Sequence, residues 1–190
     1  ELKLNDDYRA QMFRYTNSFK EARFLRAYFY FNLVRAYGDV PYFTEMVTTD
    51  QVNSLTRTPA QEIFNAIIAE CDKLSTELPA DYTKLGLDGI APAENGRVTC
   101  YAALALKARA ALYAASPLFN PENNKDLWRR AAEANKEVIE TCTANGFKLS
   151  KYSELWGPNN WSNNEMIFVR RYNGNISTLE EYNFPMGVPG

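Results

Sequence analysis

Residues 21–41 read EARFLRAYFYFNLVRAYGDVP, and this stretch is the most informative part of the chain. Aromatic and aliphatic residues lie on nearly every face of a helix through it, so such a helix should be surrounded by others. Its polar residues are scattered: Arg23, Arg26, Asn32 and Arg35. Gly38 can take the left-handed conformation that ends a helix, and Pro41 prevents the helix from restarting. The stretch predicts the enclosed internal pillar of a helical bundle. The side chains expected in the core are Leu25, Tyr28, Phe29, Phe31 and Leu33.

The composition limits the possible classes of function. The chain of 190 residues is 46% hydrophobic and 23% charged, which suits one globular domain. A net charge of −2 without a basic cluster argues against nucleic-acid binding, which needs a concentrated Lys and Arg surface. The longest apolar runs, such as 27–31 and 110–115, are far shorter than the roughly 20 residues that cross a bilayer. We therefore expect no membrane-spanning segment in these residues.

The absence of histidine excludes several kinds of chemistry. Ser-His-Asp and Cys-His catalysis, histidine-ligated metals and a histidine proton shuttle all require this residue. The three cysteines, Cys71, Cys100 and Cys142, are widely spaced within predicted helices. This spacing favours small buried thiols over a zinc site or a disulfide framework. The sequence thus predicts no cofactor and no metal.

Two helix boundaries in the N-terminal half follow from local signals. A first helix, capped by Asn5 or Asp6, is expected to break near residues 16–18 before the enclosed helix begins. The sequence Thr-Pro-Ala-Gln at 58–61 predicts the start of the next helix, with Thr58 as N-cap and the glutamine as its capping-box partner. The residues that follow recur every three or four positions, so this helix should pack with one face.

Two more helices are predicted at about residues 99–115 and 124–144. The first is rich in alanine, whose small side chain lets neighbouring helices approach closely. The second should bury these residues: Leu127, Trp128, Ala131, Ala132, Val138, Ile139 and Cys142. Successive antiparallel helices with alanine at their contacts predict a mostly all-α stack over residues 1–146. The stack resembles tetratricopeptide repeats (TPR-like), although its spacing is too irregular for a strict repeat.

Residues 147–190 belong to the same single domain but lose the helical pattern. The apolar piece 166–169 predicts a strand or an extended segment within irregular structure. Aromatic and asparagine residues gather in this tail: Tyr152, Trp156, Trp161, Tyr172 and Tyr182, with Asn159, Asn160, Asn163, Asn164, Asn173, Asn175 and Asn183. A sugar ring needs a flat surface for stacking and polar groups for its hydroxyls, so this mixture suits a glycan. The alternative is that the aromatics anchor loops and the asparagines make turns.

Several motifs occur in one order along the chain. They are the 21–41 stretch, Arg57-Thr58-Pro59, Gly96-Arg97 before the alanine-rich helix, Trp128 with Ala132 and Val138-Ile139, and Phe147-Lys148-Leu149 with Tyr152, Leu155 and Glu165-Met166-Ile167-Phe168. In this order they resemble the SusD/RagB family of surface glycan-binding lipoproteins, which work with TonB-dependent transporters in Bacteroidetes. The resemblance covers nearly the whole chain. Members of the family are much longer, so it implies the helical central part of such a protein.

The resemblance implies a function and a setting. Proteins of this family bind a glycan without cleaving it and deliver it to a SusC-like TonB-dependent transporter. They lie at the surface of the outer membrane, held there by a lipid anchor that these residues do not include. The family also implies a sugar-stacking role for Tyr182. Trp161, Arg170 and Asn183 are further candidate glycan ligands because of their side-chain chemistry.

Two other interpretations stay open. A TPR-like scaffold could bind another protein through its helix faces, with no sugar site. A glycosidase would need two carboxylates flanking one sugar bond. Candidates are present, but no spacing selects a pair among them: Asp88, Glu154, Glu165, Glu180 and Glu181.

Overall fold

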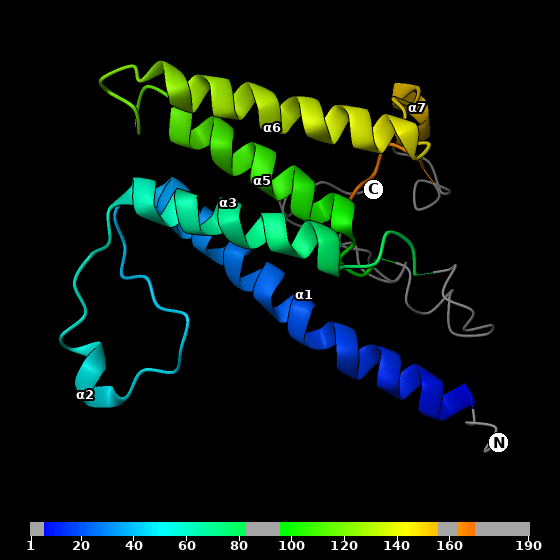
Figure 1. The fold of residues 1–190 in the computed structure, drawn as a ribbon, viewed down its shortest axis with the longest axis horizontal. Coiled ribbons are helices and arrows are strands. Elements are labelled where there is room, and N and C mark those ends of the chain that lie inside the picture. The colour runs from blue at the N-terminus through cyan, green and yellow to red at the C-terminus, as the bar shows by residue number, and fades with distance from the viewer. Residues whose placement is uncertain (1–5, 83–95, 156–162, 170–190) are drawn as a thin grey trace, which may run out of the picture.

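The computed structural model describes residues 6–82, 96–155 and 163–169. Its helices are α1 (Asp6–Tyr37), α2 (Thr49–Val52), α3 (Ala60–Glu77), α5 (Cys100–Ala115), α6 (Lys125–Ala144) and α7 (Tyr152–Leu155). Figure 1 shows α1, α3, α5 and α6 stacked in that order, each antiparallel to the next. Among the described residues, strand-like pairing is limited to an isolated bridge between Val40 and Thr58. The prediction of a mostly all-α stack of antiparallel helices is confirmed.

Helix α5 is the internal pillar of this stack. It lies between α3 and α6 (Figure 1), and most of its surface is buried. Its buried alanines are Ala102, Ala103, Ala108, Ala110, Ala111, Ala114 and Ala115. Because alanine has no side chain beyond Cβ, the neighbouring helices can pack close to the α5 backbone on both sides. The alanine-rich sequence therefore allows α5 to take the innermost position.

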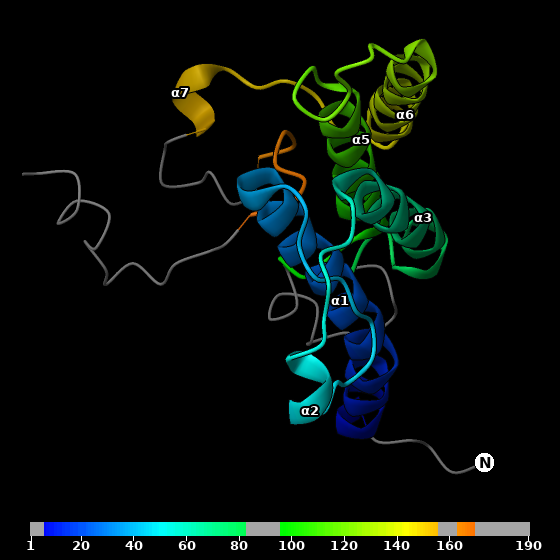
Figure 2. The same ribbon diagram turned by 90° about the vertical axis from the view of Figure 1, so that its left-hand side faces the viewer.

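Helix α1 lies at the edge of the stack of α3, α5 and α6 (Figure 2), and one of its faces is buried. Phe31 is buried as predicted, next to Phe24 and Val34. The other side chains expected in the core are partly exposed: Leu25 at 38%, Tyr28 at 36%, Phe29 at 59% and Leu33 at 42%. The prediction that this helix is enclosed on all sides is wrong. Among the described helices α3 is its main neighbour, so a helix that is apolar all round keeps part of its apolar surface outside.

Helix α1 is also continuous through residues 16–18, where the sequence predicts a break. The three polar side chains there donate hydrogen bonds to carbonyls one turn earlier in the same helix. Thr16 Oγ1 donates to the carbonyl of Met12 at 2.8 Å, and Asn17 Nδ2 donates to that of Phe13 at 3.0 Å. These groups are therefore satisfied inside the helix, and they do not need a turn.

The side chain of Asp39, just after the end of α1, makes a hydrogen bond to the start of α3. Gly38 has a φ of +69° and ends α1, as predicted. Asp39 Oδ1 then accepts a hydrogen bond at 2.8 Å from the backbone N–H of Ala60, in the first turn of α3. The predicted capping box is wrong. The backbone N–H of Thr58 donates to the carbonyl of Val40, and no side chain of the predicted box caps the start of α3. A residue distant in sequence supplies the cap in its place.

The glutamine of the predicted capping box has a different role. Gln61 Nε2 donates to the carbonyls of Ala114 and Phe119, each at 2.7 Å. Both carbonyls lie at or beyond the C-terminal end of α5, where helix carbonyls lack intrahelical partners. Gln61 therefore fastens the start of α3 to the end of α5.

Helix α6 covers the outer side of α5 with one face. Ala131, Ala134 and Cys142 are buried, whereas Trp128 is 39% exposed and Ile139 is 65% exposed. Ala132 is exposed as well, so the structure contradicts the prediction that Trp128, Ala132 and Ile139 are buried. Helix α6 is the outer layer here, so only its inner face has a neighbour among the described residues. The stack is tied together by Lys107 of α5, whose Nζ lies 2.5 Å from Asp72 of α3 and 2.6 Å from Glu137 of α6.

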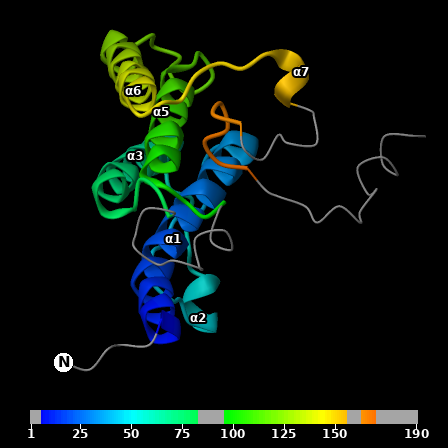
Figure 3. The ribbon, with the colours of Figure 1, turned by 90° about the vertical axis from the view of Figure 1, so that its right-hand side faces the viewer.

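Residues 163–169 return to the side of α1, as Figure 3 shows. The Phe168 ring meets the Phe24 ring edge to face, with centroids 5.6 Å apart, and Ile167 packs against the core. The segment contains turns and bends, so of the predicted strand or extended segment within irregular structure, the strand is not formed in 163–169 and the structure there is irregular. Its position is set by these apolar contacts, and it pairs with no neighbouring strand. No helix in the described ranges is long and apolar enough to cross a membrane.

Replacing Asp39 by Ala should lower the free energy of unfolding by about 1 kcal/mol, because the first turn of α3 loses an acceptor. Asp39→Asn should keep most of this stability. Thr58→Ala should cost less than about 0.5 kcal/mol, since its hydroxyl caps nothing. Urea denaturation of the three variants would measure the differences. A larger loss for Thr58→Ala than for Asp39→Ala would contradict the assignment.

Candidate functional site

The four predicted glycan ligands, Trp161, Arg170, Tyr182 and Asn183, lie outside the described residues. The structure therefore does not test them. It does describe the segments that flank Trp161, namely 147–155 and 163–169. These segments show how the tail is attached to the helices.

A small polar network joins Ser150 to Asn163 and Glu165. The Ser150 hydroxyl donates to Asn163 Oδ1, and the Ser150 backbone N–H donates to Glu165 Oε2, both at 2.8 Å. Asn163 Oδ1 also accepts from the backbone N–H of Glu165 at 2.8 Å, the pattern of an asparagine that makes a turn. Asn163 is thus a turn residue, and Glu165 joins the segment 163–169 to Ser150.

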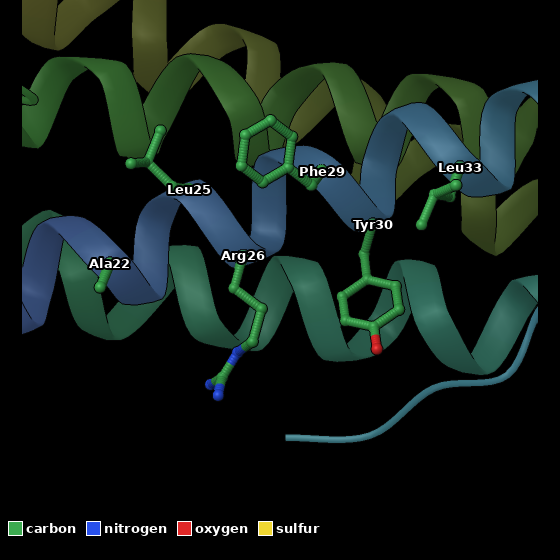
Figure 4. A pocket seen from close by; sticks show the side chains of 6 residues that line it. All are labelled: Ala22, Leu25, Arg26, Phe29, Tyr30 and Leu33. Carbon is green, nitrogen blue, oxygen red and sulfur yellow. The ribbon is translucent and has the colours of Figure 1, made fainter. Parts of the chain in front are cut away.

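The described face of α1 carries a shallow depression of about 430 Å³. Figure 4 shows its lining side chains, which all come from α1: Ala22, Leu25, Arg26, Phe29, Tyr30 and Leu33. Its two polar groups are already engaged. Arg26 Nη1 donates to the carbonyl of Thr44 at 2.8 Å, and the Tyr30 hydroxyl pairs with the backbone of Phe43 at 3.1 Å.

A glycan does not suit this depression. Sugar hydroxyls that lose water need hydrogen-bond partners, and most of the lining offers none, because Ala22, Leu25, Phe29 and Leu33 have apolar side chains. An apolar side chain of another polypeptide segment carries no such penalty. The depression therefore suits packing against protein. The sequence pattern does not predict this surface, because apolar residues lie on nearly every face of the helix and the pattern does not show which face stays exposed.

The arginines of α1 pair with carboxylates, as expected for architectural residues. Arg23 Nε lies 2.6 Å from Glu70 Oε1, and Arg23 Nη1 lies 2.5 Å from Glu77 Oε2. The hydrogen bond to Glu70 is the main cause that raises the pKa of Arg23. Arg26 also lies 3.8 Å from Glu70. These pairs connect α1 to α3 and offer no free charge for an acidic ligand.

A second polar cluster connects α1 to the segment before α5. Arg97 Nε and Nη2 donate to the two carboxylate oxygens of Glu21, each at 2.7 Å. The Tyr82 hydroxyl donates to Glu21 Oε1 at 3.0 Å or to the carbonyl of Val98 at 2.7 Å. Burial and the neighbouring Glu21 raise the pKa of Tyr82. A tyrosine kept protonated beside a paired carboxylate is a structural group, not a proton donor at neutral pH.

The described carboxylates and thiols are candidate groups for catalysis or metal binding, and the structure places several of them. No group of three or more His, Cys, Asp or Glu residues in the described ranges could hold a metal ion. Of the glycosidase candidates described, Glu165 accepts the Ser150 N–H, and Glu154 lies in the short helix α7. The cysteines are free thiols, and burial raises the pKa of Cys71 to about 12. A thiol with such a pKa forms almost no thiolate at neutral pH.

Comparisons with known proteins agree on one family. A family model for SusD-like proteins, described as starch-binding and associating with the outer membrane, matches residues 3–112. A SusD-like protein (P25) of Formosa agariphila is 25% identical over 149 residues, which are 78% of this chain and 24% of that protein.

Two solved structures from Bacteroides fragilis are also similar. A SusD-like protein has a TM-score of 0.63 and 28% identity, covering 83% of this chain and 27% of that chain. A SusD-like carbohydrate-binding protein has the same TM-score and identity, covering 80% of this chain and 26% of that chain. The chain thus spans about a quarter of the length of the relatives it matches. Their helical part has the same arrangement as the stack described above.

The buried thiol of Cys71 predicts how stability depends on pH. Its pKa in the folded protein lies above the ordinary value of 9.0, so the unfolded chain releases its proton first as pH rises. The free energy of unfolding should therefore fall above about pH 9, by up to about 1.4 kcal/mol per pH unit for this group. Cys71→Ala should be less stable at pH 7, because it leaves a small cavity, but its stability should fall less steeply between pH 9 and 11. Urea denaturation across this range tests the difference, and equal slopes for both proteins would contradict it.

Proposed function

Because the chain belongs to the SusD-like family of starch-binding, outer-membrane-associated proteins, we propose that it is part of a protein that binds a glycan at the cell surface. The observation that carries the proposal is the family match over residues 3–112. The helical stack supports it, because it shares its arrangement with a SusD-like carbohydrate-binding protein at a TM-score of 0.63. The chain corresponds to a quarter of that protein, so the proposal concerns the longer protein.

The proposed glycan contacts lie in the tail. Tyr182 and Trp161 would supply flat surfaces for stacking on a sugar ring, and Arg170 and Asn183 would supply paired hydrogen bonds to its hydroxyls. The described part of the tail supports this only indirectly. The network of Ser150, Asn163 and Glu165 joins the described segments that precede and follow Trp161 in the sequence.

The proposed protein binds its glycan without cleaving it. Binding needs stacking and hydrogen bonds, whereas hydrolysis needs two carboxylates across one sugar bond. The described candidate Glu165 is already engaged with Ser150, which is consistent with a binding role for the region. Release of reducing sugar from a bound polysaccharide by the purified protein would overturn this part of the proposal.

The proposed partner is a SusC-like TonB-dependent transporter, which would receive the glycan at the outer membrane. The family description, association with the outer membrane, supports this location. Attachment through a lipid anchor outside these residues would suit a chain whose described helices do not cross a membrane. Co-purification of the longer protein with a transporter from outer membranes would test the partnership.

A second candidate function is a helical scaffold that binds another protein. The specific observation is the depression on α1, which is apolar and whose two polar groups are already engaged. The two candidate functions differ in which residues of the tail they require. Only glycan binding requires Tyr182 and Trp161.

Glycan binding can be tested by affinity gel electrophoresis of the longer protein, with starch as the first polysaccharide and a panel of others after it. Tyr182→Ala and Trp161→Ala should each weaken binding at least about ten-fold, or about 1.4 kcal/mol, because a stacking surface is lost. Trp128→Ala is the matched control. This tryptophan lies on α6, its Nε1 donates to Asn123, and its loss should leave binding unchanged.

Two results would contradict the proposal. Retardation by no polysaccharide in the panel would favour the scaffold. Retardation that Tyr182→Ala and Trp161→Ala leave intact would move the site away from the tail.

A further inference from the structure

Two contacts between the antiparallel helices α5 and α6 fix which of their residues lie side by side. Lys107 Nζ of α5 lies 2.6 Å from Glu137 Oε2 of α6, and Asn135 Nδ2 of α6 donates to the carbonyl of Ala108 of α5 at 3.5 Å. In an antiparallel pair, a step towards the start of α5 matches a step towards the end of α6. Cys100 stands seven residues before Lys107, and Cys142 stands seven residues after Asn135. The two cysteines are therefore at the same level of the helix pair.

The two cysteines also lie on the faces that the helices turn to each other. Seven residues are close to two full turns, so Cys100 shares the face of Lys107 and Cys142 shares the face of Asn135. Cys142 is buried, and Cys100 is half-buried and packs against the core. Next to Cys100, the Tyr101 ring meets the ring of Phe147, which follows α6, with centroids 4.9 Å apart. The start of α5 and the end of α6 thus meet at one end of the stack (Figure 1).

The electrostatic environment of the two thiols agrees with this placement. Burial is the main cause that raises the pKa of Cys100, and the charge of a Cys142 thiolate raises it further. The pKa of Tyr101 is raised by burial and then by the charges of the same two thiolates. Because such effects weaken with distance, the two thiols lie near each other.

The packing of α6 on α5 brings the two backbones close. The buried residues of α6 are Ala131, Ala134 and Cys142, so small side chains form its contact with α5. A disulfide needs Cα atoms about 4.4–6.8 Å apart, a separation that only closely packed helices reach. Cys71 of α3 is at a different level, because its neighbour Asp72 pairs with Lys107, two turns along α5 from Cys100. Two turns are about 10 Å, which is too far for a disulfide.

We propose that Cys100 and Cys142 are the site of an intrachain disulfide that joins the start of α5 to the end of α6, and that Cys71 remains a thiol. The oxidant is another disulfide, of a protein or of a small molecule. The half-buried Cys100, as a thiolate, attacks one sulfur of the oxidant, breaks its S–S bond and releases the first thiol. Cys142 then loses its proton, attacks the Cys100 sulfur of this mixed disulfide and releases the second thiol. The chain loses two protons and two electrons, and the oxidant gains them.

The disulfide fixes the end of α6, from which the chain leads into the tail. It also closes a loop that contains the whole of α6 up to Cys142, so it restricts the unfolded chain and stabilises the α5–α6 pair. Disulfides persist in oxidising surroundings such as the cell surface, the location proposed above. The pairing of the two cysteines does not depend on glycan binding.

The test oxidises the folded longer protein with glutathione disulfide, alkylates the remaining thiols in urea and maps the tryptic peptides by mass spectrometry. The three cysteines lie on different peptides, 58–73, 98–107 and 137–148. We expect peptide 98–107 linked to 137–148, with 58–73 alkylated. The same oxidation in urea is the control. It should give all three pairings, because loop length alone distinguishes weakly between them.

Two variants support this measurement. Cys142→Ser should stop the reaction at the mixed disulfide of Cys100 with glutathione, which shows that Cys142 performs the second step. Cys71→Ser should leave the linkage unchanged. In the oxidised protein, the backbone amides of residues 141–147 should exchange hydrogen at least about ten-fold more slowly than in the reduced protein, whereas those of 125–131 should exchange equally in both.

Several results would overturn the proposal. A stable glutathione adduct on Cys100 of the unsubstituted protein would show that the two sulfurs do not meet. Alkylation of both Cys100 and Cys142 after oxidation, or a link to Cys71 in the folded protein, would show that the pairing is wrong. Linked peptides that occur only in a dimer on non-reducing electrophoresis would show that the bond joins two copies of the chain.

Discussion

The close approach of α3 and α6 to the alanine faces of α5 is the constraint on which the rest of this structure depends. Ala103, Ala110 and Ala115 are fully buried, and the lack of bulk at these positions lets two helices pack on opposite sides of one. Lys107 joins the layers with one ammonium group shared between Asp72 and Glu137. Burial lowers the pKa of this lysine, but the two carboxylates outweigh it and raise the pKa overall. Once α5 is innermost, α1 and α6 become the outer layers.

This arrangement separates support from recognition. The described part of the chain carries paired arginines, a buried thiol with a raised pKa and a tyrosine held beside a carboxylate, which make their contacts within the stack. The functional conclusion therefore rests on family membership and on the chemistry of the tail. A stack of this kind suits such a role, because a rigid set of packed helices can hold irregular segments in place without taking part in binding.

The local features predicted from sequence agree with the structure where the deciding groups are close in the chain. The end of α1 at Gly38 and the end of α6 at Gly146, with φ values of +69° and +87°, belong to this class. Features decided by distant groups were predicted wrongly. The cap of α3 comes from Asp39, and the expected partner Gln61 turns to the end of α5. The candidate site residues lie outside the described ranges, so Tyr182, Trp161, Arg170 and Asn183 stay predictions.

The sequence by itself determined that the chain forms antiparallel helices and where most of them end. Propensity, periodicity and glycine conformation act within a few residues, so they are readable without a fold. Only the tertiary structure decided which helix is innermost. Both α1 and α5 are apolar enough to be enclosed, but the bulky side chains of α1 keep neighbours at a distance, whereas the alanines of α5 admit them on both sides. Enclosure depends on how closely neighbouring backbones can approach, and no single helix carries that information.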